Sequence, residues 1–148
     1  MTSLYEAAGG GAGLLALAHA WHERCLADPV AAHPFSHGTH ADHLGRLAAY
    51  WGEALGGPAA YTASMGDETR VLRIHAGNGE HAELDARAVA CFDQALLDVG
   101  ITEPARSVLH DYFAWATLRM AAHPDTPDTV PDGEVLPHWD WNGRSGIA

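Results

Sequence analysis

His75 stands at the end of one apolar segment, directly before a glycine-broken loop that reads Ile74-His75-Ala76-Gly77-Asn78-Gly79. A neutral imidazole is the commonest metal ligand among protein side chains. A ring held at this place could coordinate a metal from one side, so we predict that His75 is a metal ligand. The alternative is a core histidine that is hydrogen-bonded to a carbonyl, and His81, further along the chain, competes for the ligand role.

A second set of histidines lies upstream. The run from Phe35 to Pro58 contains His40 and His43 at helical spacing, and His22 falls on the inward face of the preceding segment. We predict that His22 and His43 line one wall of a pocket whose other wall carries His75. There each ring could donate a hydrogen bond when neutral, or act as a general acid when protonated.

The same run permits a different metal. His37, His40 and His43 could gather zinc, which takes four nitrogen, sulfur or carboxylate ligands, with Cys25 or Asp42 completing the set. Paired close-set ligands of the Cys-x-x-Cys kind do not occur in the sequence, however. Solvated histidines explain His37 and His40 more simply.

The elements that must position these residues are helices. Apolar residues recur at three- and four-residue steps in several stretches, and no stretch shows sustained period-two alternation, so we predict an all-α fold. Capping residues, glycines and prolines mark the ends. The expected helices are a short one capped by Ser3-Leu4-Tyr5-Glu6, one containing Leu14, Leu15, Ala18, Trp21, His22 and Cys25 that ends near Asp28-Pro29, one from Thr39 to Gly56-Gly57-Pro58, one or two turns over Arg70 to His75, one from Leu84 to Val99 closed by Gly100, and one from Val108 to Met120 after Pro104.

Length and composition indicate one domain. The chain has 148 residues, of which 47% are hydrophobic, enough to bury a core, and no apolar run is long enough to span a membrane. The first residues lack a basic start, so we expect a cytoplasmic protein. Cys25 and Cys91 have no framework of spacings and are expected to be buried free thiols.

The charge excludes some classes of partner. The formal net charge is −11, with eight arginines and no lysine. Nucleic acid binding requires clustered cations, so we expect no nucleic acid partner, and binding to anionic membranes is disfavoured. The aliphatic side chains are small on average, and a flat apolar cofactor between helices would supply the missing core volume.

Ordered motifs then point to a family. The chain resembles the group II truncated haemoglobins over residues 4–120, at Leu4-Tyr5-Glu6 with the following glycines, Leu26-Ala27-Asp28-Pro29, Phe35, Leu55-Gly56-Gly57-Pro58, His75-Ala76-Gly77 and the two closing helices. The resemblance implies a two-over-two helical sandwich. It also implies that His75 is the proximal ligand of haem b iron, that Phe35 packs against the haem face, and that Leu47 is an apolar residue of the distal helix.

Three positions depart from the family pattern. His22 stands where a distal tyrosine is most common, and His43 stands at a distal-helix position that is usually small. Ala88 replaces a tryptophan that commonly lines the pocket, which would open space or remove an indole donor. The chain therefore lacks the tyrosine and the tryptophan at the positions where the family pattern commonly places them.

The resemblance implies a haem protein that binds oxygen or another diatomic ligand at ferrous iron. It also implies redox chemistry, either oxidation of nitric oxide to nitrate or reduction of peroxide, with an electron-donating reductase as partner. Two alternatives stay open. One is a haem enzyme that converts a small organic substrate in a pocket widened at Ala88, and the other is a helical module that binds an apolar ligand other than haem.

The C-terminal part has a different character. We expect residues 1–122 to form the globin-like domain and residues 123–148 a proline-rich, irregular extension. Its end, Trp139-Asp140-Trp141-Asn142-Gly143, is too aromatic for a linker. We therefore expect the extension to pack on the domain or on a second subunit of a homodimer.

Overall fold

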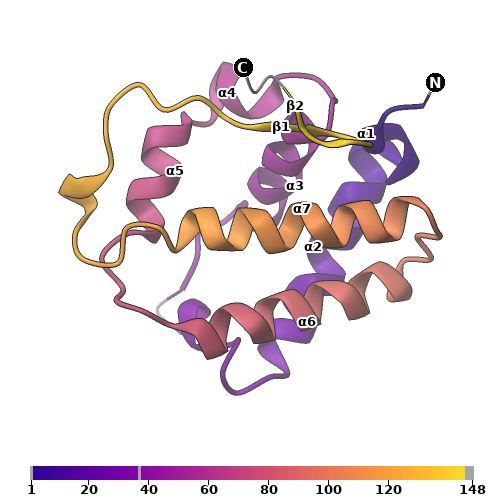
Figure 1. Ribbon diagram of the computed structural model, residues 1–148. Coiled ribbons are helices and arrows are strands. Elements are labelled where there is room, and N and C mark those ends of the chain that lie inside the picture. Colours follow the sequence, from indigo (N-terminus) through magenta and orange to yellow (C-terminus); the bar gives the residue numbers. More distant parts are fainter. Residues whose placement is uncertain (1, 37, 146–148) are drawn as a thin grey trace.

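The computed structural model describes residues 2–36 and 38–145. This part of the chain forms seven α-helices, two 3-10 turns and one small hairpin (Figure 1). The helices are α1 (Leu4–Ala7), α2 (Gly10–Leu26), α3 (His43–Ala54), α4 (Ala60–Ser64), α5 (Glu68–His75), α6 (Ala82–Asp98) and α7 (Ala105–Met120). The 3-10 turns are η1 (His33–Phe35) and η2 (Pro127–Thr129), and the strands are β1 (His138–Asp140) and β2 (Gly143–Ser145).

Four long helices form a two-over-two sandwich. α2 packs on α3, α6 packs on α7, and α2 crosses α6 to join the two pairs. The core between them includes Leu14, Leu17, Phe92, Leu96 and Leu109, all almost fully buried. The rings of Phe92 and Phe113 stack at 4.0 Å across the α6–α7 contact. The predicted all-α, two-over-two architecture is confirmed.

Local signals set most helix ends where the sequence predicts them. The Ser3 hydroxyl accepts the Glu6 backbone N–H at 3.1 Å and caps α1. Gly9, with φ of 97°, separates α1 from α2, because only glycine adopts this backbone angle without strain. The Asp67 carboxylate accepts the Arg70 N–H at 2.8 Å and starts α5, and Gly100 follows α6 in the left-handed region.

The start of α3 differs from the prediction. The helix begins at His43, not at Thr39, because the residues before it form a turn. The Asp42 backbone N–H donates to His40 Nδ1 at 3.0 Å, and this side-chain acceptor takes up an amide that a helix would use. His40 therefore lies outside the helix and is exposed. Because α3 begins only at His43, His40 and His43 do not lie on one helix as the zinc alternative required. His37 lies outside the described residues.

The buried face of α2 also differs in one position. Leu17 is fully buried, whereas Leu15, which was expected to face inward, is 39% exposed. The buried stripe of Leu14, Leu17, Ala18 and Cys25 faces both α3 and α6, and Leu15 is turned away from it. No helix in the described part of the chain is long and apolar enough to cross a membrane.

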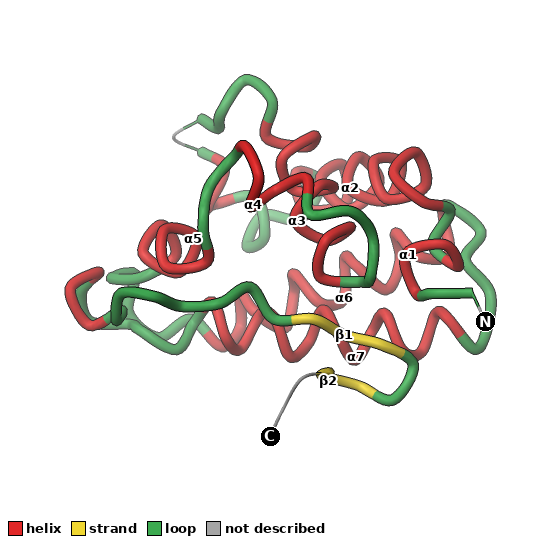
Figure 2. Tube along the Cα trace, turned by 90° about the horizontal axis from the view of Figure 1, so that it is seen from above, coloured by secondary structure: helices red, strands yellow, loops and turns green. Residues whose placement is uncertain are grey.

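The extension after α7 is more ordered than the sequence suggested. β1 and β2 form an antiparallel hairpin, and the Trp139 ring packs on Tyr112 and Trp115 of α7. Figure 2 shows the chain running past α5 before it reaches the hairpin beside α7. Val130 and Leu136 on this path are 1% and 4% exposed. An irregular segment was expected because a three-residue strand is too short to show alternation.

Candidate functional site

Three rings from three elements meet on one side of the molecule. His22 of α2 lies with its ring centroid 4.9 Å from that of Phe35 in η1 and 5.7 Å from that of His43 on α3. Phe35 and His43 are also 5.7 Å apart. The structure thus brings together three residues that are separated in the sequence but were predicted to share a pocket.

Each of the two histidines carries a buried nitrogen that needs a partner. His22 Nδ1 and His43 Nε2 are inaccessible to solvent and have no hydrogen-bond partner among the described residues. Such a buried polar atom costs about 1–3 kcal/mol when it stays unpaired. A polar guest between the two rings would remove this cost.

Burial also affects the charge state of His43. It lowers the pKa of the His43 imidazole, and the neighbouring His22, His75 and His40 lower it further, since a charge on any of them would repel a second one. The ring of His43 is therefore neutral at pH 7. A neutral imidazole offers one N–H donor and one lone pair.

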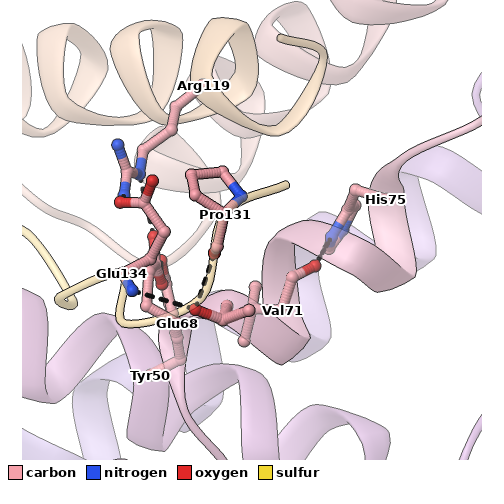
Figure 3. A network of polar contacts seen from close by, with 8 residues as sticks. Tyr50, Glu68, Val71, His75, Arg119, Pro131 and Glu134 are labelled. Atoms are coloured by element: carbon pink, nitrogen blue, oxygen red, sulfur yellow. Dashed lines mark hydrogen bonds and ion pairs between the residues drawn. The ribbon is translucent and has the colours of Figure 1, made fainter. Parts of the chain in front are cut away.

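His75, the last residue of α5, is oriented by its own helix. Its Nδ1 lies 2.8 Å from the backbone carbonyl oxygen of Val71 (Figure 3). A carbonyl only accepts, so Nδ1 carries the proton and donates, and the lone pair of the neutral ring is on Nε2. A histidine that ligates a metal usually donates its other ring N–H in this way. The His75 side chain is exposed, so Nε2 is accessible.

His81, the competing ligand candidate, has a different setting. It lies at the N-terminus of α6, with Nδ1 2.9 Å from the Asp85 carboxylate. His75, and not His81, is among the residues whose charge lowers the pKa of His43. His81 is thus paired with a carboxylate of its own helix, whereas the Nδ1 of His75 is bonded to a backbone carbonyl.

Leu47 and Ala88 lie at the edge of the same region. Leu47 follows His43 by one turn of α3, so both side chains share a face of that helix. Leu47 and Ala88 are partly buried against the main core. Leu47 is therefore linked to the ring cluster through its neighbour His43. Ala88 is linked to it through Trp21, whose indole bonds the Ala88 carbonyl and packs on Phe35.

The sequence reasoning missed the role of Trp21. Its indole N–H donates to the backbone carbonyl of Ala88 at 3.1 Å, and its ring packs edge-on against Phe35, Trp51 and Phe113. The space expected next to Ala88 is therefore bordered by an indole from α2. A large aromatic residue directly before His22 was the available signal.

Two further predictions concern metals and thiols. In residues 2–36 and 38–145, no group of three or more histidine, cysteine, aspartate or glutamate side chains could hold a metal ion. A haem iron needs only one protein ligand on the proximal side, so this observation bears on zinc and not on haem. Cys25 and Cys91 are buried free thiols, as predicted, and pack with Ala31 against Trp21 and Phe35.

The two-over-two helical sandwich is the arrangement that the sequence resemblance implied for a globin. The family model of the bacterial-like globins matches residues 3–123. The chain therefore belongs to the bacterial-like globin family.

Solved structures of haemoglobins have the same fold as this chain. A haemoglobin from Chloroflexus aurantiacus is 27% identical, with a TM-score of 0.70 over 81% of this chain and 98% of its own. The group II truncated haemoglobin from Bacillus anthracis is 19% identical, with a TM-score of 0.74 over 91% of this chain and 98% of its own. A haemoglobin from Thermobifida fusca is 24% identical, with a TM-score of 0.68 over 90% of this chain and 100% of its own.

No curated protein sequence is significantly similar to the chain. The resemblance to truncated haemoglobins, which was read from the sequence motifs, is nevertheless confirmed by the family model and the structural neighbours.

Proposed function

We propose that this protein binds haem b through His75 Nε2 and binds a diatomic ligand at the ferrous iron, on the side where His22, Phe35 and His43 lie. Membership of the globin family supports haem-based binding of a diatomic ligand. The observation that carries the assignment of the iron ligand is the hydrogen bond from His75 Nδ1 to the Val71 carbonyl, which leaves Nε2 as the free ligand atom.

The residues present fit a haem group. The His75 imidazole on α5 has a fixed tautomer and is exposed, and His22 and His43 each carry a buried ring nitrogen without a hydrogen-bond partner in the described part of the chain. When bound, ferrous haem supplies reversible coordination of small gases, and the protein sets the ligand affinity through its proximal histidine and its distal donors. Phe35 and Leu47 supply the apolar surface that the macrocycle needs.

The distal histidines are suited to hydrogen bonding. His43 is neutral at pH 7, because burial lowers its pKa, and it can therefore donate one N–H to a polar guest. A neutral imidazole is a poor general acid at this pH. This favours stabilisation of a bound ligand over peroxide reduction, which consumes two protons and two electrons for each peroxide.

We extend the proposal to oxidation of nitric oxide. Nitric oxide and dioxygen form one nitrate ion with the uptake of one electron, so an electron-donating reductase is part of this proposal. The role of this chain in it is to hold both small molecules in an apolar, water-poor pocket next to His22 and His43. Trp21, which borders the region at Ala88, favours such small reactants over a larger organic substrate.

A hemin titration tests the proposal. Wild-type protein should bind one hemin, with the absorption bands of a histidine-ligated haem in the ferric and ferrous forms. His75→Ala should lose these bands or bind hemin far more weakly, and added imidazole should restore them in His75→Gly. His81→Ala is the matched control and should behave like wild type. A wild-type protein that takes up no hemin would disprove the proposal, and loss of hemin in His81→Ala alone would move the ligand to His81.

A further inference from the structure

We propose that residues 123–136, which we call the C-terminal strap, position α5 and thereby fix the proximal histidine, His75, so that the strap sets how firmly haem is retained. The inference rests on the proposed haem function and extends it to a segment that lies, after its first residue, beyond the family match to residues 3–123. Thr69 and Val130 are the positioning residues.

Side chains of α5 bind the backbone of the strap. The Thr69 hydroxyl accepts the Glu134 backbone N–H at 2.9 Å and donates to the Pro131 carbonyl at 3.3 Å (Figure 3). One turn later, Arg73 donates to the Val130 carbonyl at 3.1 Å. Thr69 is almost fully buried, so its two hydrogen bonds are shielded from water.

Backbone hydrogen bonds hold the loop directly behind His75. The Gly77 N–H donates to the His123 carbonyl and the Gly79 N–H to the Pro124 carbonyl, both at 2.9 Å. Gly77 has a positive φ of 79°, and a Cβ at this position would lie 3.3 Å from Pro127 Cδ. The close approach of the strap therefore depends on glycine here.

An apolar contact also joins the strap to α5. Leu72 of α5 and Ala76, directly after it, form a buried cluster with Val130 of the strap, and Met120 at the end of α7 packs against it. η2 and α7 are the elements that pack most closely on α5. The strap is thus a principal packing partner of this helix.

His75 lies on a different face of α5 from the strap contacts. Successive helical residues are turned by about 100°, so Thr69, Leu72 and Arg73 share one side of α5, and His75 lies well away from it. The strap therefore supports α5 from behind and leaves the His75 ring free. It adds a support that is independent of the bond between His75 and Val71.

A buried ionic network ties the strap to the start of α5. Glu68 accepts the Tyr50 O–H at 2.7 Å and the Arg119 Nε–H at 2.8 Å, and Arg119 also lies 3.4 Å from the Glu134 carboxylate. Figure 3 shows this network at the opposite end of α5 from His75. Both ends of the short helix are therefore anchored, which limits how far His75 can move.

The test uses the full-length protein with and without hemin. Thr69→Val removes the hydroxyl that bonds the strap, and Val130→Ala trims the apolar contact. Thr117→Val is the matched control, because its hydroxyl donates to the Phe113 carbonyl within α7. In the haem-free protein, both strap variants should speed amide hydrogen exchange in α5 about tenfold and leave α6 at wild-type rates, whereas a global loss of stability would raise exchange in both.

In the hemin-loaded protein, hemin transfer to excess apomyoglobin should be about tenfold faster in the strap variants, a change of about 1.4 kcal/mol. The iron–histidine stretching band of the ferrous form should broaden in resonance Raman spectra. Thr117→Val should match wild type in all three measurements. Wild-type hemin loss and α5 exchange in both strap variants would overturn the strap proposal, whereas a wild-type protein that never binds hemin would overturn the proposed function on which it rests.

Discussion

Trp21 of α2 donates its indole N–H to the backbone carbonyl of Ala88 on α6 at 3.1 Å, and this bond joins the two helices that cross in the sandwich. The resemblance to group II truncated haemoglobins predicted open space at Ala88, and an indole from the opposite helix reaches this position.

Trp21→Phe should therefore reduce the free energy of unfolding by about 0.5–1.5 kcal/mol, because the Ala88 carbonyl keeps its backbone bond within α6 and loses only its side-chain donor. Ala88→Trp should also be destabilising, by about 1–3 kcal/mol through overpacking, and Trp21→Ala should relieve that cost in the double variant. Urea unfolding measures all three. Trp141→Phe is the matched control, since it loses an exposed indole bond to Thr2 and should change little. If the changes in unfolding free energy of Trp21→Ala and Ala88→Trp are additive in the double variant, the two side chains do not compete for the same space.

The two distal histidines should slow the release of oxygen from the ferrous protein. His22→Leu and His43→Leu should each increase the oxygen dissociation rate about tenfold, because each removes one hydrogen-bond donor. Carbon monoxide, a weaker acceptor, should be much less affected. Stopped-flow mixing measures both rates, with the exposed His40→Leu as control. If the double variant His22→Leu/His43→Leu releases oxygen at the wild-type rate, these two residues do not contact the bound ligand.

Acidification should destabilise the haem-free protein through His43. Its pKa is lowered by burial and by His22, His75 and His40, so the folded state binds a proton less readily than the unfolded chain. The stabilising contribution is present above the unfolded value of about 6.5 and is lost as the pH falls through the lowered folded value. His43→Leu should therefore lose less stability than wild type between pH 7 and pH 5. Parallel pH profiles in urea unfolding would refute this.

Removing the charge of Glu68 should be costly. Its carboxylate is 1% exposed and paired with Arg119 and Tyr50, and breaking a buried ion pair at one partner costs about 3–5 kcal/mol. Glu68→Gln should show most of this loss in urea unfolding. Glu134→Gln, at the more exposed end of the same network, should cost less than about 1 kcal/mol. Equal effects of the two substitutions would mean that the buried pair does not dominate.

Truncation after Ala122 should lower the melting temperature of the protein. The removed segment contains the buried Val130 and Leu136, and the loss of one such leucine side chain costs about 2–5 kcal/mol. Circular dichroism during heating measures the shift. Val135→Ala within the extension is the control, since Val135 is 73% exposed and should not alter the melting temperature. An unchanged melting temperature after truncation would reject the packing of the extension on the globin body.

Local chemistry explains which predictions from the sequence are correct. Ser3 caps α1, Gly9 and Gly100 break the chain at two helix ends, and Pro104 precedes α7, and each signal acts within a few residues. The start of α3 was missed because the His40 ring, and not a typical capping side chain, takes up the Asp42 amide. Leu15 was misplaced because helical spacing alone does not show which side of α2 meets α6.

The sequence by itself determined the helical class, the family and the candidate histidines, because helix periodicity, end signals and ordered motifs are written along the chain. Only the tertiary structure decided that Trp21 reaches Ala88, and that one nitrogen each of His22 and His43 has no partner within the described residues. It also decided that the C-terminal strap packs on the helix of His75. These are contacts between residues far apart in the sequence. They depend on how the helices and loops pack against one another, and a pattern within a few residues does not specify that packing.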